Sequence, residues 1–151
     1  TLMSSNWDKS TLFSLKRFIL RIIKGETIGT PGIWQLQHRI KTQGFNQAIL
    51  SVEKNDGNIE LREDEVNIMG YKMLRQNSID EASQLFSLNV QRFPSSANAH
   101  DSLAEALIKQ GKMEQAKLVI TRGLELAVEQ HIPLLVESLK RQQNAISAQL
   151  K

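Results

Sequence analysis

Ser51 and Lys54 are the residues whose types and spacing come closest to a catalytic pair. A serine and a lysine three residues apart on a helix lie one turn apart, which can bring a nucleophile beside the base that activates it. Roughly one such match arises by chance in a chain with this serine and lysine content, and no Lys-Thr-Gly segment accompanies it. We therefore interpret Ser51 to Lys54 as a solvated helix end and predict no catalytic residue in this chain.

The residues that usually hold metals and cofactors are few and scattered. His38, His100 and His131 have no histidine or carboxylate at a ligand spacing such as i, i+4, so we expect them at surface or groove positions. The chain has no cysteine, which excludes disulfides and zinc-thiolate sites. Its eight glycines form no phosphate-binding loop. We predict neither a metal nor a cofactor.

Residues Lys9 to Lys24 predict an amphipathic helix with a basic side. Its cations are Lys9, Lys16, Arg17, Arg21 and Lys24, and its apolar residues are Leu12, Leu15, Ile19, Ile22 and Ile23. A basic amphipathic helix is attracted to anionic lipid. The alternative is that the apolar stripe packs on an attached catalytic domain or on the helical hairpin that follows. We expect that packing, and a membrane is the less favoured partner.

The composition is that of an ordinary globular chain of 151 residues, enough for one domain or slightly more. The net charge of +3 is spread among acids, and the few aromatic residues do not alternate with basic ones, so we predict no nucleic-acid partner. No apolar run approaches the roughly 18 residues that span a bilayer. The start without methionine or a signal-peptide pattern suggests a piece of a longer protein.

An internal repeat positions most of the candidate residues. Residues 63–96 and 97–130 align at an offset of about 34 residues, which is the tetratricopeptide period. Small and large apolar residues recur at matching places: Met69 with Leu103, Gly70 with Ala104, Leu74 with Ile108, Gln76 with Gln110, Asn77 with Gly111, Ala82 with Ala116, Phe86 with Ile120, and Asn89 with Gly123. Each unit has the 3.6-residue periodicity of two helices, and Gly111 suits a helix C-cap.

The flanks predict further helices. Pro133 can open a helix whose apolar ladder runs to Leu150 and caps the last repeat. A degenerate hairpin turning near Gln43-Gly44 precedes the repeats. We predict an all-α fold of antiparallel helical hairpins stacked as a short tetratricopeptide-like solenoid with a C-terminal capping helix. The expected parts are residues 1–30, which hold the N-terminal segment and the amphipathic helix, 31–57, the degenerate hairpin, and 58–151, two repeats and the cap.

Two stretches carry a family resemblance, namely Asn67-Ile68-Met69-Gly70-Tyr71 and the segment from Leu88 to Ala106, LNVQRFPSSANAHDSLAEA. They resemble the tetratricopeptide tail at the C-terminus of many bacterial hydrolases, in particular serine hydrolases of the β-lactamase and penicillin-binding-protein class, and a similar tail follows some α/β-hydrolase esterases. The resemblance covers roughly residues 33–127. Leu2 to Asn6 and the following helix look like the last strand and final helix of a β-lactamase-type domain.

That resemblance implies that the catalytic residues lie upstream, so that no position here inherits them. It also implies a periplasmic or cell-envelope location; without it the cytoplasm would be expected, and the residues leave the compartment open.

The inner surface of the predicted solenoid is where a partner would bind, because the first helix of each pair lines it. Helical phase directs eight residues there: Asp64, Asn67, Tyr71, Arg75, Asn98, Asp101, Glu105 and Lys109. Asn67 and Asn98 could hydrogen-bond a peptide backbone, and the acids would prefer a basic or amide-rich partner. The alternative is a merely solvated face. Asn89 points inward, and we expect it to have a structural role.

The function we predict is non-catalytic, either binding a protein or peptide segment or positioning an attached catalytic domain of a larger bacterial hydrolase. Two alternatives stay open. The chain could be a fragment of a β-lactamase-type serine hydrolase, or the repeats could form a homodimerisation scaffold.

Overall fold

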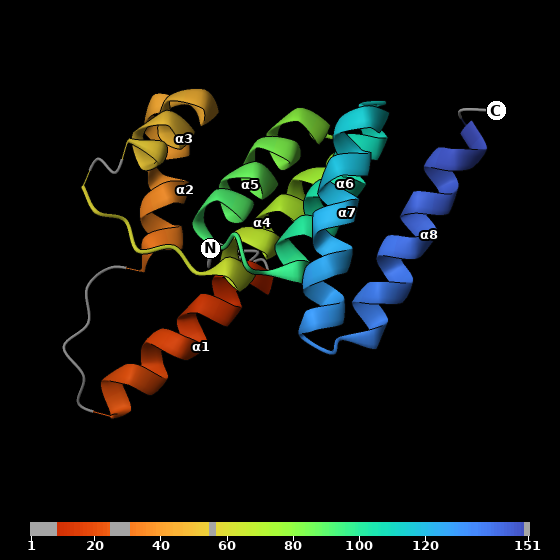
Figure 1. The fold of residues 1–151 in the computed structure, drawn as a ribbon. Helices are drawn as coiled ribbons and strands as arrows, with labels where there is room; N and C mark the ends of the chain where they lie inside the picture. The colour runs from red at the N-terminus through yellow and green to blue at the C-terminus, as the bar shows by residue number, and fades with distance from the viewer. Residues whose placement is uncertain (1–8, 25–30, 55–56, 150–151) are drawn as a thin grey trace. The chain divides into compact units, whose positions relative to one another are not determined.

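A computed structural model describes residues 9–24, 31–54 and 57–149, and every element among them is a helix. Figure 1 shows them in chain order from α1 to α8. Their bounds are α1 Lys9–Ile23, α2 Gly32–Gln43, α3 Phe45–Glu53, α4 Glu63–Arg75, α5 Ile79–Arg92, α6 Ala97–Lys109, α7 Met113–Glu129 and α8 Pro133–Gln149. The all-α prediction is confirmed. The expected strand at Leu2 to Asn6 lies outside the described residues, as does Leu150, the end of the predicted apolar ladder.

The chain divides into two compact units, Thr1–Ile68 and Met69–Lys151. The division falls inside α4, whereas the repeats are predicted to begin at residue 58. None of the helices that the structure describes is long and apolar enough to cross a membrane.

In the second unit and along α4, the helix boundaries repeat at the interval found in the sequence. α4 and α6 begin at Glu63 and Ala97, and α5 and α7 begin at Ile79 and Met113, so both starts are separated by 34 residues. Within the second unit, α6 packs against α5, α7 and α8, and α7 also packs against α8. The 34-residue period is therefore a property of the helix boundaries as well as of the residue types.

Three helix ends in the second unit share one backbone motif. Asn77, Gly111 and His131 follow α4, α6 and α7 with φ angles of 61°, 75° and 55°. At each end the amide after this residue donates to a carbonyl five residues back, as in Ser78 to Met73 at 3.0 Å. This is the Schellman arrangement, which requires a left-handed residue and is met at lowest cost by glycine. The predicted role of Gly111 in ending a helix is confirmed.

Close helix contacts form the core of the second unit. Phe86, Ala82, Ala116 and Ile120 are all 0% exposed. A Cβ atom placed on Gly70 would lie 2.3 Å from Cε1 of Phe86, so that only glycine lets α4 approach the ring. Ala82 and Phe86 thus meet in one core with Ala116 and Ile120, the residues with which they align in the repeat.

The first unit holds α1 and the hairpin of α2 and α3. Gly44, with a φ angle of 85°, joins the two hairpin helices at the place where the sequence predicted the turn. The hairpin buries one apolar side, namely Ile33, Leu36, Ala48, Ile49 and Val52. α1 packs on the hairpin through Phe18, whose ring centroid lies 5.6 Å from that of Trp34.

Candidate functional site

Tyr71 of α4 and Glu105 of α6, which helical phase assigned to the same face, contact each other in the second unit. The Tyr71 hydroxyl donates to Oε2 of Glu105 at 3.2 Å and accepts a hydrogen bond from Ser102 Oγ at 3.3 Å. Its ring packs edge-on against Phe86, with centroids 5.2 Å apart. The phenol is thus anchored at both its ring and its hydroxyl.

The same surroundings keep Tyr71 protonated. Burial raises its pKa to about 12, because the phenolate loses solvation, and the carboxylates of Glu105 and Asp101 act in the same direction. The hydrogen bond from Ser102 opposes this shift, since it stabilises the anion. At neutral pH the hydroxyl is therefore a hydrogen-bond donor.

Asp101, one turn before Glu105, faces α8. One carboxylate oxygen accepts a hydrogen bond of 2.9 Å from Gln142 Nε2, and the Ser138 side chain also bonds to the carboxylate. Burial raises the pKa of Asp101, the negative charge of Glu105 adds to the rise, and Ser138, Arg141 and Gln142 lower it. Asp101 therefore joins α6 to α8 and is less available to a partner than its helical phase suggested.

The remaining candidates of α6 are more open. Lys109 Nζ lies 3.8 Å from Oε1 of Glu105, and these two side chains are 48% and 39% exposed. Arg75 is exposed at the end of α4, and Asn98 is half-buried at the start of α6. We call the six candidates of the second unit the α6 face: Tyr71, Arg75, Asn98, Asp101, Glu105 and Lys109.

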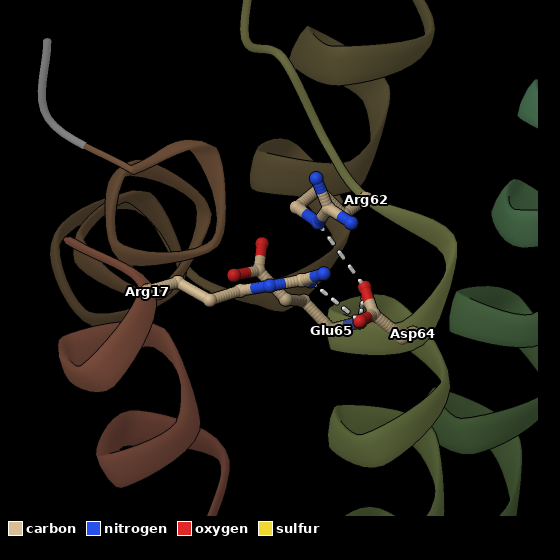
Figure 2. Close-up of polar contacts among 4 residues, drawn as sticks. All are labelled: Arg17, Arg62, Asp64 and Glu65. Carbon is tan, nitrogen blue, oxygen red and sulfur yellow. Dashed lines mark hydrogen bonds and ion pairs between the residues drawn. The ribbon is translucent and has the colours of Figure 1, made fainter. Parts of the chain in front are cut away.

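The two candidates that fall in the first unit differ from each other. The Asp64 carboxylate forms ion pairs with two arginines: Oδ2 lies 2.6 Å from Arg17 Nη1, and Oδ1 lies 3.4 Å from Arg62 Nε. Figure 2 shows both arginine side chains pointing towards Asp64. The Asp64 carboxylate is thus committed to groups of its own chain. Asn67 carries a buried side-chain oxygen that has no hydrogen-bond partner among the described residues.

Glu65 completes this charged cluster at the start of α4. It is only 4% exposed, and its side chain lies beside that of Arg17 (Figure 2). Three acids occupy the first turn of α4, where the positive end of the helix dipole favours them. The cluster therefore links α1 to the beginning of α4 within the first unit.

The Ser51 hydroxyl is occupied by its own surroundings. Its oxygen donates to the Ala48 carbonyl at 2.8 Å and accepts from Arg39 Nη1 at 2.7 Å. α3 ends at Glu53, and Lys54 is exposed beyond it.

The prediction of a surface or groove position is wrong for His100, which is 5% exposed. Its Nδ1 lies 2.8 Å from the Ser96 carbonyl one turn earlier. Burial is possible because Gly123 faces it, where a Cβ atom would come within 3.1 Å of His100 Cβ. No group of three His, Cys, Asp or Glu residues that could hold a metal occurs within 9–24, 31–54 and 57–149.

Sequence reasoning missed three polar residues of this region, Ser102, Ser138 and Gln142. Ser102 is 0% exposed and lies within the apolar stripe of α6. Its helical phase therefore indicates a core residue and not a member of a functional site. Ser138 and Gln142 lie on either side of the buried Leu139 in α8, and their spacing of four residues is the only signal that could have placed them on one side of this helix.

The α6 face combines a protonated phenol, two carboxylates and exposed cations on neighbouring helices. Such groups can hydrogen-bond the backbone of an extended segment and form ion pairs with its side chains. No family model matches the sequence, and a search of curated proteins finds no match.

Proposed function

We propose that this chain is a non-catalytic, tetratricopeptide-type module that binds an extended peptide or partner segment along the α6 face. The repeats are proposed to continue as a short solenoid capped by α8. The observation that supports this most is the pairing of Tyr71 with Glu105 one repeat further along, which aligns polar side chains of successive first helices. Glu105 and Lys109 remain part-exposed on this face and can form contacts with a partner.

The partner's chemistry follows from the groups that remain open. Glu105 offers a carboxylate to a lysine, arginine or amide group, and Lys109, which lies 3.8 Å from it, and Arg75 offer cations. A segment with a basic or amide side chain beside an acidic one would match this order.

A peptide array of random extended segments, probed with the purified chain, tests the proposal. Glu105→Gln removes the charge but keeps an oxygen that can accept the Tyr71 hydrogen bond, so the fold should persist while binding of basic peptides weakens about ten-fold. Glu125→Gln, on the exposed side of α7, is the matched control. Equal losses in both variants, or an array without selective binding, would reject the α6 face as the binding surface.

The module is further proposed to be an accessory part of a larger bacterial serine hydrolase. The support is the sequence resemblance of the segments from Asn67 and from Leu88. Determining the coding sequence of the native protein tests it: a hydrolase domain upstream is expected, and a native chain without one would reject this part of the proposal.

A further inference from the structure

Among the side chains of α1 that the structure describes, the half-buried apolar ones and the exposed apolar ones lie on different sides of the helix. Leu15 and Phe18 are half-buried, and Phe18 meets Trp34 of the hairpin. Leu12, Ile19, Leu20 and Ile23 remain exposed by 43%, 45%, 55% and 74%. Packing on the hairpin therefore accounts for one stripe and leaves the other uncovered.

The uncovered residues form a continuous stripe. Leu12, Ile19 and Ile23 recur at intervals of seven and four residues, and Leu20 borders them, which places all four on one side of a helix with 3.6 residues per turn. Half of the eight large hydrophobic side chains that are exposed in the described part of the chain lie on this one helix. A surface of this kind usually marks a place where something else binds.

The charge of α1 limits the kind of surface that can bind this exposed stripe. Between Lys9 and Lys24 the sequence has five cations and no acid. Lys16 is exposed and falls within the apolar stripe, and Lys24 is exposed at its border. Arg17 forms an ion pair with Asp64 and is therefore engaged within the chain.

A second copy of this chain fits the stripe poorly. Two such helices placed face to face would bring Lys16 and its neighbours against the same cations of the other copy, and like charges oppose that pairing. A surface that is both apolar and anionic fits, because the apolar residues enter the acyl boundary while lysine and arginine reach the head groups.

We propose that the exposed stripe of α1, with Lys16 and Lys24 beside it, binds the surface of an anionic lipid membrane. The helix lies in the plane of that surface, and the hairpin remains on its other side. This site is separate from the α6 face and would bring the partner-binding module to a membrane surface.

Flotation of the full chain with lipid vesicles tests the proposal. Vesicles of phosphatidylcholine with about 30% phosphatidylglycerol should carry the chain, while pure phosphatidylcholine vesicles should carry little, because each cation near an anionic surface strengthens binding about five-fold. Raising the salt concentration to about 0.5 M should release it, since the Debye length shortens to a few ångström.

Three variants assign the binding to the stripe. Ile23→Ser should weaken partition about ten-fold by removing apolar area, and Lys16→Gln about five-fold by removing a charge. Leu134→Ser is the matched control, because Leu134 of α8 is 78% exposed but lies outside the basic helix, and its partition should not change. All three positions are exposed, so circular dichroism should show unchanged helicity.

Absence of flotation with anionic vesicles would overturn the proposal and would assign the stripe to a protein surface, such as an attached domain. Equal binding to both vesicle types, or an equal loss in Leu134→Ser, would overturn it too. Glu105→Gln should leave flotation unchanged, so failure of the peptide-binding proposal can be told apart from failure of this one.

Discussion

Tyr71 donates a 3.2 Å hydrogen bond to Oε2 of Glu105, and the two residues stand 34 positions apart in the sequence. They are therefore equivalent positions of successive repeats, facing each other from α4 and α6. One turn before Glu105, Asp101 of α6 accepts a hydrogen bond from Gln142 of α8. Polar side chains on the first helices thus connect three neighbouring helices outside their apolar core.

The titration of Tyr71 should report this contact directly, because the chain contains one tyrosine. We expect tyrosinate absorbance after a rapid pH jump to rise with a midpoint of about 12. Glu105→Gln should lower the midpoint by removing a nearby negative charge, and Ser102→Ala should raise it by removing a hydrogen bond to the phenolate. A midpoint near that of free tyrosine in the folded chain would contradict the buried contact.

Asp101 should make stability depend on pH in the direction opposite to that of a salt-bridged carboxylate. Its pKa in the folded chain is raised above the ordinary value of 3.8, so the folded state binds the proton more tightly than the unfolded state. The contribution of this residue is greatest below that ordinary value. It is lost as the pH rises towards and through the folded pKa.

Urea unfolding at a series of pH values, with Asp101→Asn as reference, measures this contribution. The free energy of unfolding of the parent chain should fall relative to the variant as the pH rises through the window just above 3.8. Gln142→Ala should extend the window upwards, because it removes a hydrogen bond that lowers the pKa of Asp101. If the free energy of unfolding varied with pH in the same way in the parent chain and in Asp101→Asn, Asp101 would not be the source of the pH dependence.

Most of the fold follows from local patterns that the sequence displays. The 34-residue offset anticipated the starts of α4 to α7, because the same apolar spacing must recur wherever the same pair of helices packs. Gly44 and Gly111 marked turns, since both adopt a positive φ angle. Asn77, which aligns with Gly111, takes the same left-handed conformation, although the sequence indicates a helix end only at Gly111.

The candidate site was less predictable, because helical phase orients a side chain without naming its neighbour. Phase placed Asp64 towards the inner surface, but Arg17, 47 residues earlier, engages its carboxylate. Asp101 was assigned to a partner, but Gln142 of α8 binds it, and the register of α8 against α6 depends on packing that no single periodicity reveals. Contacts between distant segments were thus the part that sequence reasoning could not supply.

Overpacking the closest helix contacts should damage the fold. Ala82→Leu and Ala116→Leu each add three carbon atoms at a position that is 0% exposed, and we expect each to lower the free energy of unfolding by about 1–3 kcal/mol. Ala145→Leu on the exposed side of α8 is the control and should change it by less than about 0.5 kcal/mol. If both buried substitutions left the urea midpoint unchanged, the repeat alignment would be wrong.

The backbone motif shared by three helix ends predicts that some substitutions there raise the free energy of unfolding and that others lower it. Asn77 and His131 hold φ angles of 61° and 55°, a conformation that a side chain disfavours and glycine adopts freely. We expect Asn77→Gly to raise the free energy of unfolding by about 0.5 kcal/mol and His131→Gly by about 1 kcal/mol, because asparagine tolerates this region better than histidine.

Gly111→Ala should lower the free energy of unfolding by about 1 kcal/mol at the equivalent end of α6, where the φ angle is 75°. Gln76→Gly, one residue before Asn77, is the control: it has no positive φ angle to relieve, so glycine there only adds freedom to the unfolded chain and should destabilise. Urea unfolding measures the change in the free energy of unfolding for all four variants: Asn77→Gly, His131→Gly, Gly111→Ala and Gln76→Gly. A loss in Asn77→Gly as large as that in Gln76→Gly would mean that the end of α4 does not share the backbone motif seen at Gly111.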